Sequence, residues 1–306
     1  MKVIRAQVLG FCMGVRRAVE LATTEAQRAK SGGFCTSTLG PLIHNPKVLA
    51  DLKALGVSII EEASLFVDCA PKLVEDSLII RAHGISPVIE EKLRESGCRI
   101  VDATCPKVKA SQLMVQKLSR LGFRLFLAGE AHHAEIAGLL GYAESANKDD
   151  SSQFSETQPC VVVSSTQEAG KAASELYKTS PNAKTSLLGQ TTISEDEYRN
   201  ISFAIKNYFP DLEIADTICA ATAERQSALR ELLTKTDAVI IAGGRESANT
   251  RRLLAIAQES GKPCALAENA GEIPPDFHNY GTIGLCAGAS TPDCLVDEIE
   301  AAFLNV

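Results

Sequence analysis

Three times along the chain, a cysteine stands between a strand-like run and an amphipathic helical pattern. The three residues are Cys12, Cys105 and Cys219. Runs of Val, Ile, Leu and Ala alternate with helical patterns throughout, which predicts an α/β protein with largely parallel sheets. Because the cysteine recurs at the same step of this alternation, we expect three similar units. Their predicted boundaries are 1–100, 101–213 and 214–306.

Each predicted unit carries polar side chains at two further strand ends. The end of the second strand supplies His44, His133 with Glu135, and the stretch Ser247-Ala248-Asn249, and the end of the fourth strand supplies His83, Thr191 and Ser290. Ligands of open α/β sheets bind outside the carboxyl ends of the strands. Three such units can face one shared centre, so these residues are predicted to surround a single site.

The composition excludes several other classes of protein. The 306 residues carry 31 Lys and Arg against 38 Asp and Glu, and a net charge of -7 argues against a coat for nucleic acid or anionic membranes. No apolar run approaches the roughly 18 residues of a membrane span, and the N-terminus reads as a strand instead of a signal peptide. The sequence therefore predicts a cytoplasmic protein that binds neither nucleic acid nor membrane.

The cysteines favour a metal site over a disulfide framework. Ten cysteines are spread over a long chain without a Cys-x-x-Cys pair, which favours reduced thiols. Three thiolates without a fourth suit either a catalytic zinc or a 4Fe-4S cluster with one open iron. Free cysteine also acts as a small buried hydrophobe. We expect that role for four cysteines inside apolar strand runs, Cys35, Cys160, Cys264 and Cys286.

The remaining predicted site residues suit a diphosphate and a general acid. Neutral His, Ser, Thr and Asn side chains at helix starts can bind phosphate oxygens, and the phosphate-binding glycine motifs of nucleotide sites are absent. Glu135 is an acid in an otherwise uncharged group. Beside a cluster and an anion its proton affinity should rise, as a general acid requires. The alternative is a first-turn glutamate that favours the helix dipole.

These motifs resemble the LytB family, the 4-hydroxy-3-methylbut-2-enyl diphosphate reductases. The matches run in order from residue 10 to residue 292: Gly10-Phe11-Cys12-x-Gly14-Val15, Gly40-Pro41-x-Ile43-His44-Asn45, Arg81-Ala82-His83-Gly84, Asp102-Ala103-Thr104-Cys105-Pro106, His133-x-Glu135, Gln190-Thr191-Thr192, Ile218-Cys219-x-Ala221-Thr222, Ser247-x-Asn249-Thr250 and Ala287-Gly288-Ala289-Ser290-x-Pro292. Two positions depart from the family pattern. Ala134 replaces a usual proline and Ala248 a frequent serine, which affects only the details of the diphosphate contacts.

The resemblance implies a trefoil of three α/β domains around one central 4Fe-4S cluster held by Cys12, Cys105 and Cys219. It implies reductive removal of the allylic hydroxyl of the substrate, giving isopentenyl and dimethylallyl diphosphate in the last step of the methylerythritol phosphate route. Glu135 and Thr191 would handle the hydroxyl and its proton. The diphosphate would be bound by the remaining residues: His44, His83, His133, Ser247, Asn249 and Ser290, with Ala248 in the same stretch.

Electrons must come from a small reduced carrier, ferredoxin or flavodoxin, because the chain has no sign of its own flavin or nicotinamide site. A threefold arrangement within one chain favours a monomer.

Quinolinate synthase also uses three cysteines and a pseudo-threefold α/β fold, but its motifs do not match. An iron-sulfur sensor or carrier is a further alternative, although a sensor would need the cysteines without Glu135, Thr191 and three histidines.

Overall fold

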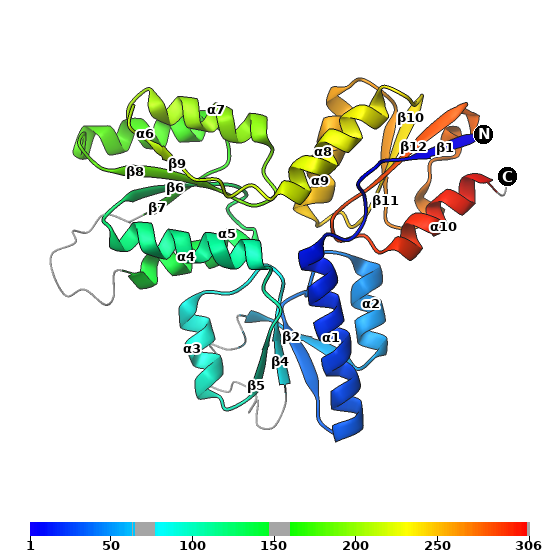
Figure 1. Ribbon diagram of the computed structural model, residues 1–306, viewed down its shortest axis with the longest axis horizontal. Coiled ribbons are helices and arrows are strands. Elements are labelled where there is room, and N and C mark those ends of the chain that lie inside the picture. Colours follow the sequence, from blue (N-terminus) through cyan, green and yellow to red (C-terminus); the bar gives the residue numbers. More distant parts are fainter. Residues whose placement is uncertain (63, 65–76, 147–159, 305–306) are drawn as a thin grey trace. The chain divides into compact units, whose positions relative to one another are not determined.

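The computed structural model describes residues 1–62, 64, 77–146 and 160–304 (Figure 1). The described chain divides into two compact units. The first unit holds residues 1–62, 64, 77–79 and 220–304, and the second holds residues 80–146 and 160–219. No helix in the described ranges is long and apolar enough to cross a bilayer.

The helices and strands alternate along both units. The first unit contains β1 (Lys2–Arg5), α1 (Met13–Gly32), β2 (Thr36–Leu39), α2 (Pro46–Ala54), β3 (Val57–Ile60), α8 (Ala220–Leu233), β10 (Ala238–Ala242), α9 (Ala248–Glu259), β11 (Cys264–Ala267), η2 (Ala270–Glu272), η3 (Pro275–Asn279), β12 (Thr282–Ala287) and α10 (Asp293–Leu304). The second unit contains α3 (Pro87–Glu95), β5 (Arg99–Asp102), α4 (Pro106–Arg120), β6 (Arg124–Ala128), α5 (Ala134–Ala146), β7 (Cys160–Val163), α6 (Thr166–Thr179), β8 (Thr185–Gly189), α7 (Glu195–Lys206) and β9 (Glu213–Ile214). The boundary between the units falls within β4 (Ser77–Ile80).

The strands form three four-stranded sheets with one common order. The orders are β3-β2-β4-β5, β7-β6-β8-β9 and β11-β10-β12-β1. In each sheet, the strand that leads to one of the three cysteines lies at the edge: β5, β9 and β1. Strand β1 pairs in parallel with β12, with Lys2 opposite Thr282, so the N-terminal strand completes a sheet of the C-terminal stretch. The prediction of an α/β fold with three parallel-sheet units is confirmed.

In the second unit, helices cover both faces of the sheet β7-β6-β8-β9. Successive side chains of a strand point to opposite faces, so an apolar strand has side chains to bury on each face. Phe126 and Ala128 of β6 pack in one apolar cluster with residues of α6 and α7. Leu125 and Leu127 pack in another with residues of α4 and α5. The ribbon shows these two helical layers on opposite sides of the sheet (Figure 1).

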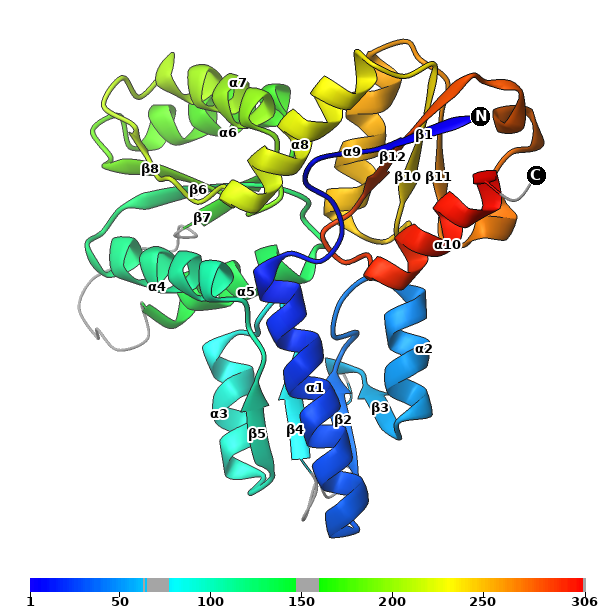
Figure 2. The ribbon, with the colours of Figure 1, turned by 45° about the vertical axis from the view of Figure 1, so that its right-hand side comes forward.

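The sheet β11-β10-β12-β1 of the first unit is built in the same way. Val239 and Ile241 of β10 pack with residues of α8 and α9, and Ile240 and Ala242 pack with α10 and the two short 3-10 helices. Turning the ribbon brings α10 forward on its side of this sheet (Figure 2). Both sheets therefore have apolar side chains packed on each face, and the predicted site residues of these sheets follow the ends of their strands.

Three helices begin with a proline directly after the N-cap residue. Asn45 caps α2, Ser86 caps α3, and Cys105 occupies the N-cap position of α4 before Pro106. Proline suits this position because its missing N-H is not needed there. The prediction that Cys105 stands at the start of a helix is confirmed.

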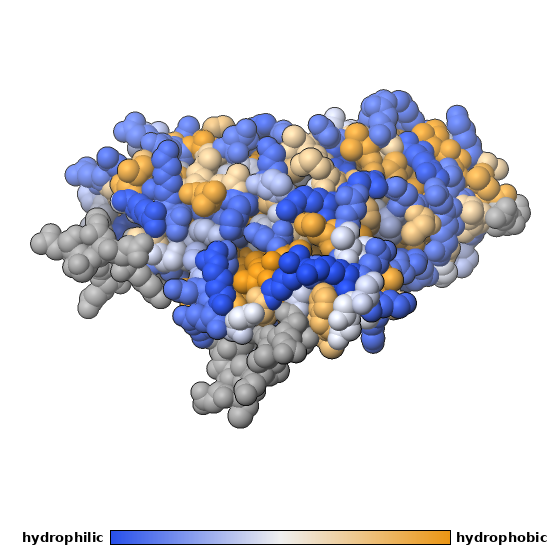
Figure 3. Space-filling model, turned by 60° about the horizontal axis from the view of Figure 1, so that its bottom comes forward, coloured by the Kyte–Doolittle hydropathy of each residue, from blue (hydrophilic) through white to orange (hydrophobic). Residues whose placement is uncertain are grey.

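On the face drawn in Figure 3, hydrophilic residues surround smaller groups of apolar ones.

Candidate active site

The three cysteines that precede α1, α4 and α8 are anchored by one repeated backbone hydrogen bond. In each case the cysteine N-H donates to a carbonyl at the end of the neighbouring fourth strand: Cys12 to Ala289 at 3.1 Å, Cys105 to Ala82 at 2.9 Å, and Cys219 to Thr191 at 3.0 Å. The acceptor either is a predicted site residue or directly precedes one. Each of these pairs lies within one compact unit, so the predicted equivalence of the three cysteines extends to their local geometry.

The three thiols are neither fully buried nor fully exposed, and each lies beside a helix N-terminus. The sulfur of Cys12 accepts the Val15 N-H at 3.4 Å as the cap of α1. Backbone N-H groups of a first helical turn favour negative charge nearby. These positions therefore suit thiolates that bind a metal.

The expectation of burial for the other strand cysteines is only partly correct. Cys160 and Cys286 are buried, and burial raises the pKa of each thiol to about 12. Cys35 is exposed and Cys264 is half-buried, so the prediction was wrong for these two. Cys35 lies just before β2, and Cys264 begins β11, which is an edge strand. Neither position is covered on all sides by neighbouring strands.

Glu135 and Thr191 meet in the second unit. Glu135 is only 1% exposed in the first turn of α5, and Thr191 follows the end of β8. The Thr191 N-H donates to Oε1 of Glu135 at 2.7 Å, and the Thr191 hydroxyl donates to Oε2 at 2.9 Å. Burial raises the pKa of Glu135 to about 7, although both hydrogen bonds from Thr191 act to lower it.

This pairing determines where a proton on Glu135 can sit. Oε1 faces a backbone N-H, which can only donate, so the proton of a neutral Glu135 belongs on Oε2. There it donates to the hydroxyl oxygen of Thr191, whose own proton becomes available to another acceptor. Glu135 can therefore give its proton to the Thr191 hydroxyl while that hydroxyl gives its own proton to another acceptor.

His133 and His83 also lie in the second unit. Nδ1 of His133 accepts the Glu135 N-H at 3.2 Å, so a neutral imidazole carries its proton on Nε2. The rings of His83 and His133 meet edge to face, with their centroids 5.1 Å apart. The structure thus brings together four predicted residues of this unit, the two histidines, Glu135 and Thr191.

Gln190 is a neighbour of this group to which no role was assigned from the sequence. Its side chain is 2% exposed, and Oε1 accepts the Glu130 N-H at 3.0 Å. A Cβ atom at Gly129 would lie 2.7 Å from that same Oε1, so the strand end of β6 must approach Gln190 without a side chain. Gln190 therefore ties the end of β6 to the strand end that carries Thr191.

In the first unit, His44 is held through its backbone. The Ser290 hydroxyl donates to the His44 carbonyl at 3.3 Å. A Cβ atom at Gly244 would lie 2.4 Å from that carbonyl oxygen, so only glycine allows this approach. The contact joins three predicted stretches of this unit. It also places the Ser290 hydroxyl in a structural bond that the sequence did not predict.

The start of α9 contains a buried amide with unsatisfied hydrogen-bonding capacity. Ser247 caps this helix by accepting the Thr250 N-H at 3.3 Å, and Ala248 is 6% exposed. Asn249 is 3% exposed, and neither its Oδ1 nor its Nδ2 has a partner among the described residues. A buried amide without partners destabilises a fold unless a ligand satisfies it. Asn249 is therefore suited to bind a polar ligand.

The loop before Asn249 is fixed by Arg245. Its N-H donates to Glu268, and its guanidinium binds Glu268 at 2.7 Å and Glu272 at 2.6 Å. The Arg245 carbonyl in turn accepts a bond from Arg251 at 3.2 Å. These contacts link the turn between β10 and α9 to the stretch that follows β11.

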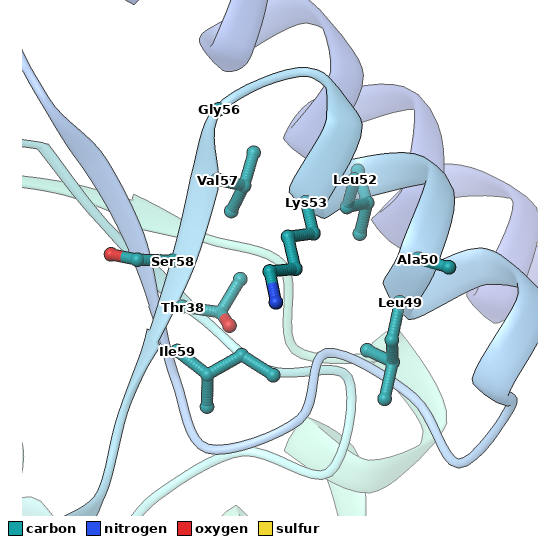
Figure 4. Close-up of a pocket in the computed structure, with 9 residues that line it drawn as sticks. All are labelled: Thr38, Leu49, Ala50, Leu52, Lys53, Gly56, Val57, Ser58 and Ile59. Carbon is teal, nitrogen blue, oxygen red and sulfur yellow. The ribbon is translucent and has the colours of Figure 1, made fainter.

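A separate cavity of about 480 Å³ lies between α2 and β3 (Figure 4). The side chains of Leu49, Leu52 and Ile59 supply much of its wall, and Lys53 reaches across it. None of the predicted site residues contributes to this wall. Its largely aliphatic lining does not suit a diphosphate.

Comparisons with known proteins agree over nearly the whole chain. A family model described as LytB protein matches residues 3–304. A 4-hydroxy-3-methylbut-2-enyl diphosphate reductase of Treponema denticola is 41% identical over 306 residues, covering 100% of both chains. The reductase of that name from Aquifex aeolicus is 35% identical, covering 99% of this chain and 96% of its own.

Two solved structures are also similar. The E-1-hydroxy-2-methyl-but-2-enyl-4-diphosphate reductase of Plasmodium falciparum has a TM-score of 0.84 at 27% identity, covering 98% of this chain and 87% of its own. A structure of (E)-4-hydroxy-3-methyl-but-2-enyl diphosphate reductase, described as the terminal enzyme of the non-mevalonate pathway, has a TM-score of 0.67 at 34% identity and covers 100% of both chains.

Proposed function

The chain belongs to the LytB family, and from that premise we propose that Glu135 and Thr191 supply the acid of its reaction. The chain is an oxidoreductase that converts 4-hydroxy-3-methylbut-2-enyl diphosphate into isopentenyl and dimethylallyl diphosphate. Two electrons and two protons are consumed, the C-O bond breaks, water leaves and a C-H bond forms. The observation that carries the acid assignment is the buried Glu135, whose pKa lies at about 7.

LytB proteins bind an iron-sulfur cluster. We propose the 4Fe-4S type, held by Cys12, Cys105 and Cys219. The three cysteines fit this group, because each thiol lies at a helix start and each backbone N-H makes an equivalent hydrogen bond to the end of a neighbouring strand. When bound, such a cluster supplies electrons and a Lewis-acidic iron. Structural zinc would need a fourth ligand to close its site.

The proton path follows from the hydrogen bonds of Glu135. At neutral pH a large share of Glu135 is protonated on Oε2, because burial holds its pKa at about 7. Its proton passes to the Thr191 hydroxyl, which donates its own proton to the departing hydroxyl of the substrate. The hydroxyl leaves as water. The Thr191 N-H stays on Oε1 throughout and stabilises the carboxylate that remains.

The diphosphate is assigned to the neutral polar side chains. His133 offers its Nε2-H because Nδ1 is occupied by the Glu135 N-H, and His83 lies beside it. Asn249 offers a buried amide without a protein partner in the described chain. We assign the same ligand to the other predicted residues: His44, Ser247, Ala248 through its backbone, and Ser290.

Further expectations from the sequence complete the proposal. We propose reduced ferredoxin or flavodoxin as the electron donor, a monomeric state and a cytoplasmic location. We also propose three domains with the boundaries 1–100, 101–213 and 214–306, with β1 as a strand that completes the sheet of the third domain.

The test is anaerobic oxidation of a reduced viologen dye by the iron-reconstituted protein, with and without the substrate. Iron and sulfide are counted in the same sample. We expect substrate-dependent oxidation by the wild type with about four irons per chain. Glu135→Gln should retain iron and lose turnover by about 10²-fold or more, because general acids contribute on that order.

Glu144→Gln is the matched control, since Glu144 is an exposed glutamate of the same helix. It should turn over at the wild-type rate. A loaded wild type without substrate-dependent oxidation would contradict the assigned reaction and favour a sensor. Wild-type turnover in Glu135→Gln would reject the acid assignment alone.

A further inference from the structure

Arg225 is a buried cation that the mechanism above does not use. It lies on α8 in the first unit and is 3% exposed. Its guanidinium donates to two backbone carbonyls, that of Ala221 at 2.7 Å and that of Gly10 at 2.7 Å. Its Nε has no partner, and no carboxylate pairs with it in the part of the chain that the structure describes. The charge is therefore buried among neutral groups.

Such a charge is unfavourable in the protein alone. Moving a cation out of water costs free energy that carbonyl dipoles offset only partly, and buried Arg is ordinarily paired with an anion. An anion bound nearby would offset the rest of this cost. The unpaired guanidinium therefore indicates a negatively charged group that the polypeptide does not itself supply.

The two carbonyls belong to residues close in sequence to two of the proposed cluster ligands. Gly10 precedes Cys12 by two residues, and Ala221 follows Cys219 by two residues. Gly10 has a φ of +74°, and a Cβ atom there would lie 3.2 Å from Oδ1 of Asp293, so its turn is tight. Arg225 binds the carbonyl of this turn, and Cys12 follows two residues later. An iron-sulfur cluster with three thiolates is an anion of the required kind.

We propose that Arg225 is a positioning residue for the cofactor: it fixes the turn that presents Cys12, and its buried charge favours the reduced state of the cluster. This inference rests on the proposed cysteine ligation. Reduction adds one negative charge to the cluster, and a nearby cation stabilises the more negative state. Removing the cation should therefore lower the reduction potential.

The experiment compares Arg225→Met, Arg225→Lys and the control Lys262→Met in iron-reconstituted protein. Lys262 is partly buried and its Nζ donates to the carbonyl of Thr236, beyond the opposite end of α8, so the control also removes one cation from one carbonyl. The readouts are iron and sulfide per chain, the midpoint potential from a redox titration followed by electron paramagnetic resonance, and the thermal midpoint with and without cluster.

We expect Arg225→Met to shift the midpoint potential to more negative values and to lose iron faster to a chelator. Arg225→Lys should keep the wild-type potential, because it keeps the charge, while losing iron faster, because it lacks the planar fork. Lys262→Met should match the wild type in both. The fall in thermal midpoint caused by Arg225→Met should be larger for loaded than for unloaded protein.

Three results would overturn the inference. They are an unchanged potential and iron retention in Arg225→Met, an equal fall in thermal midpoint with and without cluster, or a potential in Arg225→Lys as negative as in Arg225→Met. If Arg225→Met does not fold, Arg225→Gln replaces it, because Gln also removes the charge but keeps a donor for a carbonyl, and a wild-type potential in Arg225→Gln would reject the role of the charge. A wild type that binds no iron would instead reject the proposed cysteine ligation.

Discussion

Thr191 binds both carboxylate oxygens of Glu135, one with its backbone N-H at 2.7 Å and the other with its hydroxyl at 2.9 Å. The two residues are 56 positions apart and belong to different βα steps. The backbone bond orients the carboxyl group, and in the proposed mechanism the hydroxyl bond connects that group to the substrate. Because one bond comes from the backbone and the other from the side chain of Thr191, a side-chain substitution can remove the hydroxyl bond alone.

Thr191→Val should shift the pH dependence of turnover upward. In the wild type the acid form of Glu135 is lost as the pH rises through about 7, so turnover should fall there. The hydroxyl bond lowers the pKa of Glu135, and removing it raises that pKa further. The falling limb of kcat against pH should therefore move to higher pH, and kcat should drop about 10²-fold because the relay is lost.

The control for this variant is Thr192→Val at the next position, which should keep both the limb and the rate. A limb that remains at the wild-type pH in Thr191→Val would mean that Glu135 is not the group that titrates.

Two substitutions of His133 should distinguish the role of its Nδ1 atom from that of its Nε2 atom. Asn places an oxygen near Nδ1 and keeps the acceptor for the Glu135 N-H, whereas Gln places an amide near Nε2 and keeps the donor. If Nε2 binds the diphosphate, His133→Asn should raise KM about tenfold or more while His133→Gln stays closer to the wild type, since a bond to a charged group contributes about 1.5–3 kcal/mol. Steady-state kinetics checks this order, and equal KM values would argue against it.

Gly244→Ala should displace the backbone at His44, one of the residues proposed to bind the diphosphate, without removing any proposed ligand side chain. The added Cβ atom would lie 2.4 Å from the His44 carbonyl oxygen, a backbone atom that cannot rotate away. The loop must shift, so we expect KM to rise about tenfold and the free energy of unfolding to fall by about 1–3 kcal/mol. Gly170→Ala is the control, because the nearest atom to its Cβ, in Ala204, lies 4.0 Å away. Equal behaviour of the two variants in calorimetry and kinetics would contradict the predicted clash.

Asn249→Leu should weaken substrate binding and raise the free energy of unfolding. Leu has a similar shape and removes two buried polar atoms that lack partners among the described residues, so the free energy of unfolding without substrate should rise by about 1–3 kcal/mol. Substrate binding should weaken at least tenfold. Gln258→Leu, at an exposed position of the same helix, should change neither quantity by much. A loss of stability in Asn249→Leu would show that the amide already has its partners.

Much of the fold could be predicted because it depends on neighbours along the chain. The alternation of strands and helices follows from residue periodicity, and Cys105 before Pro106 specifies a helix start wherever that segment lies. The same local signals placed Glu135 in a first helical turn and Thr191 at a strand end. The sequence by itself therefore determined the fold class and the candidate residues of the site.

Only the tertiary structure decided which of these residues meet and in what surroundings. Burial is set by segments distant in sequence, so periodicity could not reveal that Cys35 is exposed or that Arg225 is buried. Arg225 reaches the Gly10 carbonyl across 215 positions, and β1 finds its partner in β12 at the other end of the chain. The pKa of Glu135 has the same origin, because removal of a carboxylate from water depends on what is packed around it.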